Sequence, residues 1–356
     1  METRTRTVPS GRTVVTGSSD GSARLWNALP QGALTTIDRQ DSVVRSFWAG
    51  RRVVSVAGSE ARVLTPAGHV VQRLRMPEPI GPFAADGSTI ALADRAGNLL
   101  LDRGGAVSLK RGAGATAVAV EPNGRVLVGR DGTVGYAGAS PVLMRVGGRV
   151  LGLSTGGDRI LVRLLDAIRV YTDSGRLVST IHTSALHAVL SPGGRAVATT
   201  RATIAQVWDA ATGRPRHTLT GHRSLVTDAE FSPNGLEIVT VSDDHTGLLW
   251  SARSGRLLHD LRGHILPIQT GRFSPDGQWI VTASQFTAGL FNARSGQLLF
   301  NLGRHTAQLT GASFSPDGKW ILTGSKDGTA RVYRCVICEP LPGLEAAAEA
   351  RLQALR

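Results

Sequence analysis

The stretch Phe-Ser-Pro-Asn-Gly at residues 231–235 decides the fold of this 356-residue chain, because it occurs three times. It returns as Phe-Ser-Pro-Asp-Gly at residues 273–277 and at residues 314–318, first 42 and then 41 residues further along. A fixed period near 40 residues indicates one supersecondary unit stacked on copies of itself. The functional question is therefore which surface of the stack binds something.

Weaker copies of this turn continue toward the N-terminus, each with an apolar residue, a turn and a glycine in the same register. Nine copies result, at spacings between 33 and 42 residues. Their turn glycines are Gly11, Gly50, Gly87, Gly124, Gly157, Gly194, Gly235, Gly277 and Gly318. The sequence thus predicts nine repeats within residues 1–338.

Each repeat has the pattern of four short strands. In the best copy, residues 226–231 alternate between apolar and polar, and residues 238–241 are a largely β-branched run. Residues 247–250 and 257–261 supply two more strands, and Pro-Asn-Gly at 233–235 suits a tight turn. Four antiparallel strands per ~40 residues are typical of a β-propeller blade, so we expect an all-β propeller.

The C-terminal half resembles the WD40-repeat propellers. Gly-His pairs at residues 221–222 and 263–264 and the Trp-Asp pair at 208–209 match the two signatures of that family. Residues 12–27 also match well, whereas between about 40 and 185 only the turn pattern is similar. The resemblance implies four-stranded antiparallel blades around one axis.

In that family a His, a strand Ser or Thr, a turn Asp and a Trp form a hydrogen-bonded chain that locks each blade. For one blade the resemblance implies His222, Ser242, Asp244 and Trp250. For the last blade it implies His305, Ser325 and Asp327, with Tyr333 in the place of Trp. Such a His, Ser and Asp set also occurs in hydrolases. Here the set recurs with the repeat, whereas a catalytic site is needed once, so we expect no enzyme and no cofactor.

How the ring closes is left open by the sequence. About eight residues precede the second strand of the first repeat, and they can serve either that repeat or the last blade, but not both. An open edge invites aggregation, so one ring of eight or nine blades is favoured. The alternative is a seven-bladed ring from about residue 78, preceded by two blades of another propeller.

Basic residues recur at equivalent turns. The net charge is +13, and only three of the 40 basic residues are lysines, a bias typical of GC-rich bacterial genomes. Five follow the turn glycine: Arg12, Arg51, Arg125, Arg195 and Lys319. Three more follow the later Ser/Thr-Gly turns: Arg176, Arg214 and Arg256.

One face should therefore be basic, either as solvated turns or as a binding surface for acidic protein, nucleic acid or anionic lipid. Aromatic residues are not interleaved with these arginines, so a stacking site for single-stranded nucleic acid is not predicted.

The repeat at residues 263–302 departs from the family. Phe286 stands where the turn Asp belongs, and Phe291 replaces the Trp. Either the blade repacks with apolar contacts, or Phe286, Ile265 and Leu266 form a protein-binding patch on the face opposite the basic turns. Two arginines that precede inner strands belong to the same face and are further candidates for contact with a partner: Arg223 and Arg304.

The C-terminal end adds two features. Cys335 and Cys338 form a lone CxxC, for which we consider structural cysteines, a metal shared with another chain, or a redox dithiol. Residues 341–356 are predicted to form an amphipathic helix with Leu344, Ala348 and Leu352 on one stripe. This end resembles bacterial propellers fused to STAND-type signalling NTPases, but the chain has no phosphate-binding loop.

These patterns predict a cytoplasmic scaffold or sensor that docks proteins on its faces, in a bacterial signalling or defence assembly. No apolar run reaches the ~18 residues of a membrane span. With two cysteines there is no disulfide framework. The alternatives are a polyanion-binding scaffold and a propeller hydrolase or lyase, for which no one-off cluster of carboxylates or histidines is evident in the sequence. Fold alone does not determine function.

Overall fold

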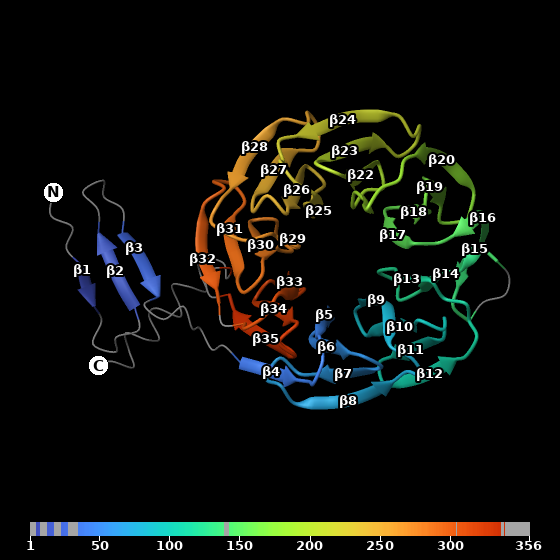
Figure 1. Cartoon of the computed structure of the whole chain (residues 1–356), viewed down its shortest axis with the longest axis horizontal. Coiled ribbons are helices and arrows are strands. Elements are labelled where there is room, and N and C mark those ends of the chain that lie inside the picture. Colours follow the sequence, from blue (N-terminus) through green and yellow to red (C-terminus); the bar gives the residue numbers. More distant parts are fainter. Residues whose placement is uncertain are drawn as a thin grey trace.

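The chain folds into a closed ring of eight four-stranded antiparallel sheets (Figure 1). The computed structural model describes residues 5–7, 13–17, 23–27, 35–138, 142–303, 305–335 and 338, the first three ranges by their backbone alone. No α-helix occurs among these residues. Eight is one of the two blade numbers that the sequence favours. The helix expected at 341–356 lies outside the described residues.

Each blade is a meander whose first strand lies nearest the central axis (Figure 1). Blades 1 to 4 are formed by β5 (Arg45–Ala49), β6 (Arg52–Ala57), β7 (Glu60–Leu64) and β8 (Val70–Arg75); β9 (Ile80–Asp86), β10 (Thr89–Asp94), β11 (Leu99–Arg103) and β12 (Ala106–Lys110); β13 (Ala117–Val120), β14 (Val126–Gly129), β15 (Asp131–Tyr136) and β16 (Met144–Arg149); and β17 (Gly152–Gly156), β18 (Arg159–Arg163), β19 (Ala167–Thr172) and β20 (Leu177–His182).

The other four blades contain the best-matching repeats. Blades 5 to 8 are formed by β21 (His187–Leu190), β22 (Ala196–Arg201), β23 (Ile204–Asp209) and β24 (Pro215–Thr220); β25 (Val226–Phe231), β26 (Glu237–Ser242), β27 (Gly247–Ser251) and β28 (Leu257–Leu261); β29 (Thr270–Phe273), β30 (Trp279–Ala283), β31 (Ala288–Asn292) and β32 (Leu298–Leu302); and β33 (Leu309–Phe314), β34 (Trp320–Ser325) and β35 (Thr329–Arg334) with β4 (Thr35–Arg39).

The ring is closed by β4, which pairs antiparallel with β35 as the outer strand of blade 8. Thr329 lies opposite Arg39, and Ala330 lies opposite Asp38. Of the two roles that the sequence left open for the first eight residues, the structure shows the pairing within the first repeat, where β1 pairs with β2, and not the closing strand. The strand that follows the first repeat leaves it and completes the last blade. The first repeat keeps β1 (Thr5–Thr7), β2 (Thr13–Gly17) and β3 (Ala23–Asn27), which form a separate three-stranded sheet.

The recurrent turn explains why the chain reverses where it does. In blade 6 the Ser232 hydroxyl donates to Asn234 Oδ1 at 2.7 Å and accepts the Glu237 N–H at 2.9 Å. Gly235 has φ +71°, a left-handed conformation that glycine adopts without strain. The side chains of Ser and Asn therefore replace the backbone partners that the turn lacks.

The apolar core lies between neighbouring blades. Val207 and Leu219 of blade 5 pack against Phe231, Ile238 and Trp250 of blade 6, and the other junctions have similar clusters. Each blade alone could not bury its faces, as expected for repeats that contact mainly their neighbours.

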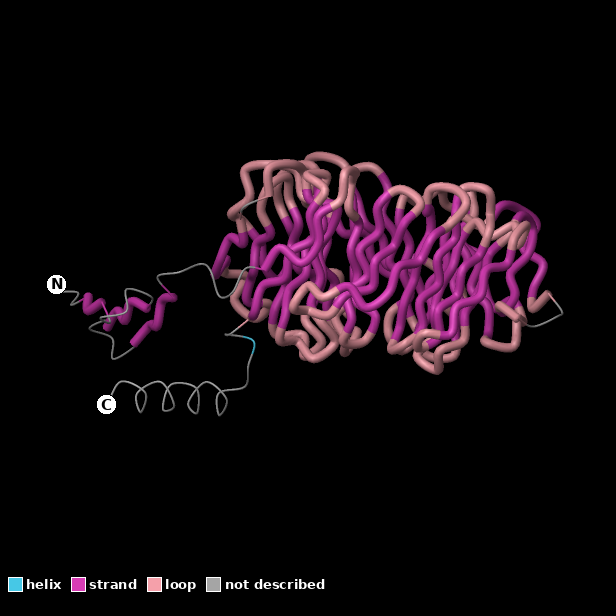
Figure 2. The backbone as a smooth tube through the Cα atoms, turned by 90° about the horizontal axis from the view of Figure 1, so that it is seen from below, coloured by secondary structure: helices cyan, strands magenta, loops and turns pink. Residues whose placement is uncertain are grey.

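Connections between strands gather on two opposite faces, seen edge-on in Figure 2. One face carries the connections between blades and those from each second strand to the third; we call it the loop face. The other carries the turns from first to second and from third to fourth strands; we call it the turn face. This alternation follows from the meander, in which successive connections leave opposite ends of the strands.

Candidate functional site

On the loop face, a hydrogen-bonded network fastens the connection that leads into blade 6. His222 Nδ1 lies 3.0 Å from Asp244 Oδ2, and His222 Nε2 lies 2.8 Å from Thr240 Oγ1. Trp250 Nε1 donates to the same hydroxyl at 2.8 Å. A neutral imidazole protonated at Nδ1 satisfies every one of these contacts.

The hydroxyl in this network belongs to Thr240, and the expectation that Ser242 supplies it is wrong. Ser242 lies two residues, or ~7 Å, further along the same face of β26. There its hydroxyl accepts the backbone N–H of Asp244 at 3.0 Å, at the turn itself. The imidazole nitrogen that points away from the Asp can reach only the deeper Thr240.

Blade 8 has the same hydrogen-bonded network, and there too a Thr supplies the hydroxyl that was expected from a Ser. His305 Nδ1 lies 2.9 Å from Asp327 Oδ2, and His305 Nε2 lies 2.8 Å from Thr323 Oγ1. Ser325, which was expected to play this part, instead donates to the Ala307 carbonyl at 3.0 Å. Tyr333 takes the place of Trp, and its hydroxyl donates to the Gly303 carbonyl at 3.3 Å.

The turn carboxylates are held ionised. Burial raises the pKa of Asp244, but hydrogen bonds from Thr246 and from the backbone N–H of Arg223 outweigh it and lower the pKa to about 2. The pKa of Asp327 is lowered for the same reasons. Two equivalent networks, each saturated with partners, support the structure of the loops and leave no free nucleophile.

Blade 7 lacks the carboxylate. His264 Nε2 still lies 2.6 Å from Thr282 Oγ1, but Phe286 occupies the position of Asp244. Burial lowers the pKa of His264 to about 4, so the imidazole is neutral. Phe291 is fully buried, whereas Phe286 is 42% exposed, so apolar repacking accounts for Phe291 alone.

Phe286 belongs to a larger group of exposed apolar side chains on the loop face. Ile265, in the connection that enters blade 7, is 84% exposed, and Leu266 beside it is partly buried. Blades 4 to 6 add exposed leucines from equivalent connections. We call the following residues the apolar arc: Leu151, Leu165, Leu186, Leu225, Ile265 and Phe286. Sequence analysis found only its blade 7 end, because lone leucines in loops carry no pattern.

Arg223 is exposed on the loop face, in the connection that enters blade 6. Its backbone N–H donates to Asp244 at 2.7 Å, which leaves the guanidinium to extend from the loop. Arg304 lies outside the described residues.

The basic residues expected on one face do share the turn face, because each belongs to a first-to-second or third-to-fourth strand turn. The exposed members are Arg51, Arg125, Arg195, Lys319, Arg176, Arg214 and Arg256. Arg12 lies outside the described residues. Arg125 is partly neutralised, because it lies over the Tyr136 ring at 3.6 Å and 3.8 Å from Glu121.

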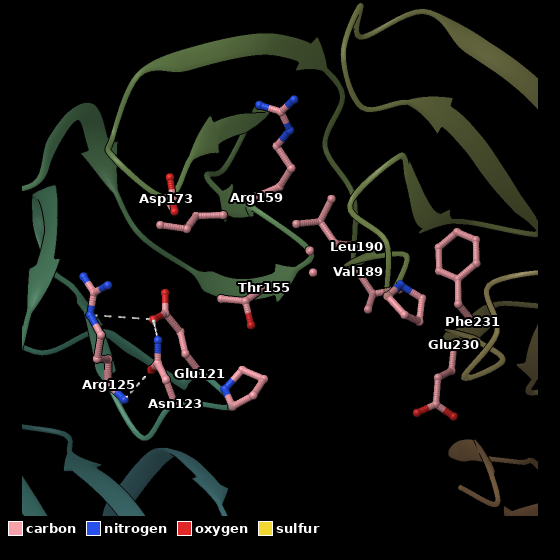
Figure 3. Close-up of a pocket in the computed structure, with 15 residues that line it drawn as sticks. Glu121, Asn123, Arg125, Thr155, Arg159, Asp173, Val189, Leu190, Glu230 and Phe231 are labelled. Carbon is pink, nitrogen blue, oxygen red and sulfur yellow. Dashed lines mark hydrogen bonds and ion pairs between the residues drawn. The ribbon is translucent and has the colours of Figure 1, made fainter. Parts of the chain in front are cut away.

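A hollow of about 480 Å³ opens on the turn face among blades 3 to 6 (Figure 3). Glu121, Asn123 and Arg125 lie on one side of it and Glu230 on the other, with Thr155 between them. Asp173 also lines it. Carboxylates and arginines are therefore mixed in this hollow.

The wall of the central channel holds an ionic cluster that sequence analysis missed. Arg272 on β29 donates to Asp228 on β25, and His187 Nδ1 on β21 lies 3.5 Å from the same carboxylate. Glu230 accepts the backbone N–H of Phe273 at 2.9 Å, and burial raises its pKa to about 7. The only signal in the sequence was a pair of acids inside a strand that is otherwise suited to burial.

A propeller hydrolase or lyase would need a group of this kind that occurs only once in the ring. Here, however, the hydrogen bonds of the cluster are made between neighbouring blades. Asp228 Oδ1 accepts its neighbour's N–H, from Ala229, at 3.0 Å, and Oδ2 accepts from Arg272 on the next blade. Blades 6 and 7 are thereby tied together at the channel wall, with His187 of blade 5 beside the same carboxylate. Among the described residues, no three His, Cys, Asp or Glu side chains are grouped to hold a metal ion.

Cys335 and Cys338 are joined by a disulfide. Cys335 is buried against blade 7 and its backbone N–H donates to the Lys319 carbonyl at 2.8 Å. The bonded pair is compatible with structural cysteines and with the oxidised form of a redox dithiol, and it corrects the alternative of metal ligands. Within the ranges that the structure covers, no helix is long and apolar enough to cross a bilayer.

Comparison with known proteins supports the fold assignment. The family described as "WD domain, G-beta repeat" matches residues 6–27, 213–251, 255–292 and 296–334. No curated protein matches the chain. The crystal structure of the computationally designed Ika8 protein superposes with a TM-score of 0.72 and 21% identity, over 83% of this chain and 97% of that one. At this identity the likeness concerns the fold alone. The chain is thus an eight-bladed β-propeller in which four segments match the WD40 repeat.

Proposed function

We propose that this chain is a non-catalytic scaffold that docks a protein partner on its loop face, over blades 4 to 7. WD40 propellers serve in general as protein-interaction scaffolds. The observation that carries the proposal here is the apolar arc, which places exposed Leu, Ile and Phe side chains on four consecutive blades. Grouped exposed apolar residues of this kind are typical of interaction sites.

The distribution of apolar residues over the two faces supports the choice of face. Within the turns of the turn face that the structure describes, the exposed large apolar residues are Leu236 and Val142, with Val70, Leu177 and Leu257 at the start of the outer strands that follow, and the turns there are rich in arginine. The loop face is therefore the face on which burial by a partner removes the most apolar surface from water. Phe286 and Ile265 are the anchors that we propose, with Arg223 at the rim of the contact.

The resemblance of the C-terminal end to propellers of signalling NTPases places the partner, in this proposal, in a bacterial signalling or defence assembly. The scaffold itself supplies shape and contacts, since the His–Asp networks of its loops are already saturated. Neither a cofactor nor a reaction forms part of the proposal.

Quantitative cross-linking and pull-down with the full chain tests this proposal. Phe286→Ala and Ile265→Ser should each release partners captured by the wild type, with a loss of ~2 kcal/mol or more for Phe286→Ala if it is a hot spot. Leu236→Ser is the matched control, because Leu236 is 62% exposed but belongs to the turn face. The proposal fails if all three variants lose partners equally, or if the folded Phe286→Ala variant retains them all.

A further inference from the structure

The junction between blades 8 and 1 differs on the turn face from the three junctions before it. At those three junctions the turn glycine of one blade lies against the turn proline of the preceding blade; a Cβ atom on Gly235 would lie 3.7 Å from Pro192 Cδ, and the next two junctions repeat this contact. At the seam of the ring the corresponding residues, Pro316 and Gly50, both line a hollow of about 510 Å³, which we call the seam hollow. A hollow thus opens at the seam, as another does among blades 3 to 6.

Two tryptophans line this seam hollow. Trp48 occupies the position of the turn Ser in blade 1, and its Nε1 donates to the Ser313 carbonyl of blade 8 at 3.4 Å. Trp320 begins the second strand of blade 8. Both indoles pack against the buried cluster at the seam on one side, and both are partly exposed. Each therefore covers core with part of its surface and faces the hollow with the rest.

Two cations and one carboxylate line the seam hollow. Arg51 and Lys319 are exposed and are close in sequence to the two tryptophans. The carboxylate is Asp317, whose Oδ1 accepts the Ser315 hydroxyl at 2.5 Å and the Lys319 N–H at 3.2 Å. Its charge offsets part of that of Lys319, and the lining keeps a net positive charge.

Each tryptophan lies close in sequence to one basic residue, and the ring brings the two pairs to one hollow. Residues 48 and 320 are far apart along the chain, and closure by β4 brings them together beside two of the basic turns. Indole surface combined with flanking Lys and Arg is the chemistry that binds unpaired bases and their phosphates. We propose that the seam hollow binds a base of single-stranded nucleic acid, with the adjoining phosphates on Arg51 and Lys319.

The second hollow of the turn face supports this choice of site by contrast. It is similar in size, but its lining has no indole, and it contains Glu121, Asp173 and Glu230. A phosphate entering it would meet three carboxylates beside two arginines, whereas at the seam it meets two cations and one carboxylate. The basic turn of blade 5, with Arg195, lies on the same face and offers a further phosphate contact. The proposal does not depend on the protein partner, which we place on the opposite face.

Fluorescence anisotropy with labelled oligo(dU) tests the proposal on the full chain. Inorganic polyphosphate and a blunt-ended DNA duplex are the comparison ligands, since they offer phosphates without an unpaired base. We expect oligo(dU) to bind about 10-fold more tightly than either. Trp320→Leu should remove this preference and leave binding to polyphosphate unchanged, whereas Trp320→Phe should retain much of it.

The charge contribution is tested separately. Arg51→Glu combined with Lys319→Glu should weaken binding to oligo(dU) and to polyphosphate. The salt dependence should flatten by ~0.7 in log–log slope for each phosphate that the variant no longer neutralises. Arg223→Glu, on the loop face, is the matched control and should change neither.

A variant-free measurement covers the case in which a tryptophan substitution unfolds the seam. Photocross-linking of wild-type protein to 5-bromouracil oligonucleotide should give adducts on the peptides that contain Trp48 or Trp320. Equal affinity for oligo(dU) and polyphosphate would overturn the base site and leave only a basic surface. Adducts elsewhere, or no binding at low salt, would overturn the proposal altogether.

Discussion

Blades 6 and 7 both place a His ahead of the inner strand, but only blade 6 keeps the turn carboxylate, and the turn between the second and third strands of blade 7 is one residue shorter. In blade 6, Asp244 binds the His222 imidazole and the backbone of the loop. In blade 7, Phe286 replaces the Asp, and His264 keeps only its contact to Thr282. The same position can thus fasten its own loop or present an apolar side chain to a partner.

This difference separates stability from binding within one repeat. A turn Asp is saturated by its own blade and has nothing left to offer a partner. A turn Phe leaves its blade without that network and projects 42% of its surface to solvent. We infer that blade 7 gives up local stability where the apolar arc needs an aromatic anchor, and that neighbouring blades hold its shape.

The largest effect should follow from removal of the carboxylate in blade 6. Asp244→Ala should lower the free energy of unfolding by ~1–3 kcal/mol, because His222 and the loop N–H groups lose their acceptor. Asp243→Ala, one residue away, should be close to neutral. Urea denaturation of both variants measures this, and equal midpoints would contradict the role assigned to Asp244.

At acidic pH, wild type and Asp244→Ala should have the same free energy of unfolding. The folded pKa of Asp244 is about 2, below the ordinary value of 3.8, so its contribution is fully present above pH ~4. That contribution is lost as the pH falls through the folded pKa. Urea midpoints of the two proteins should therefore converge as the pH is lowered from 5 to 2. A gap that stays constant over this range would show that ionised Asp244 is not what stabilises the loop.

Conversion of the blade 7 turn to the blade 6 pattern should raise the pKa of the blade 7 histidine, His264. Phe286→Asp should raise the pKa of His264 from about 4 toward its ordinary value, because a carboxylate beside the imidazole favours the protonated form. Titration of the His264 resonance by NMR measures the change. The same variant should lose the binding attributed to Phe286, and an unchanged pKa would mean that the two turns are not equivalent.

The fold could be read from the sequence because its signals are local. The turn at residues 231–235 repeats, and the hydroxyl, amide and glycine it needs lie within five residues. The His and Asp of the network were implied by the resemblance to WD40 repeats. Thr240 was missed in favour of Ser242 because both point to one face of β26, and only depth distinguishes them.

The parts of the site that were missed depend on contacts between distant repeats. Trp48 and Trp320 meet only because β4 closes the ring, and no sequence pattern indicates which strand will do so. The cluster of Asp228 with His187 and Arg272 likewise joins residues from three blades. Equivalent positions in other blades hold different residues, so periodicity carries no information about them.

The smallest expected change in the free energy of unfolding concerns the residue that follows the turn Asp. In blade 8 it is Gly328, with φ +79°, and in blade 6 it is His245, with φ +71°. A non-glycine residue in this left-handed region costs ~1–2 kcal/mol, whereas glycine is more costly to order by ~0.5–1 kcal/mol. His245→Gly should therefore raise the free energy of unfolding by ~0.5 kcal/mol, measured by urea denaturation.

Gly328→Ala is the reverse control and should destabilise the protein, because its Cβ would lie 2.1 Å from the Gln40 carbonyl oxygen. Destabilisation by His245→Gly would show instead that the His245 side chain makes a contact worth more than the strain.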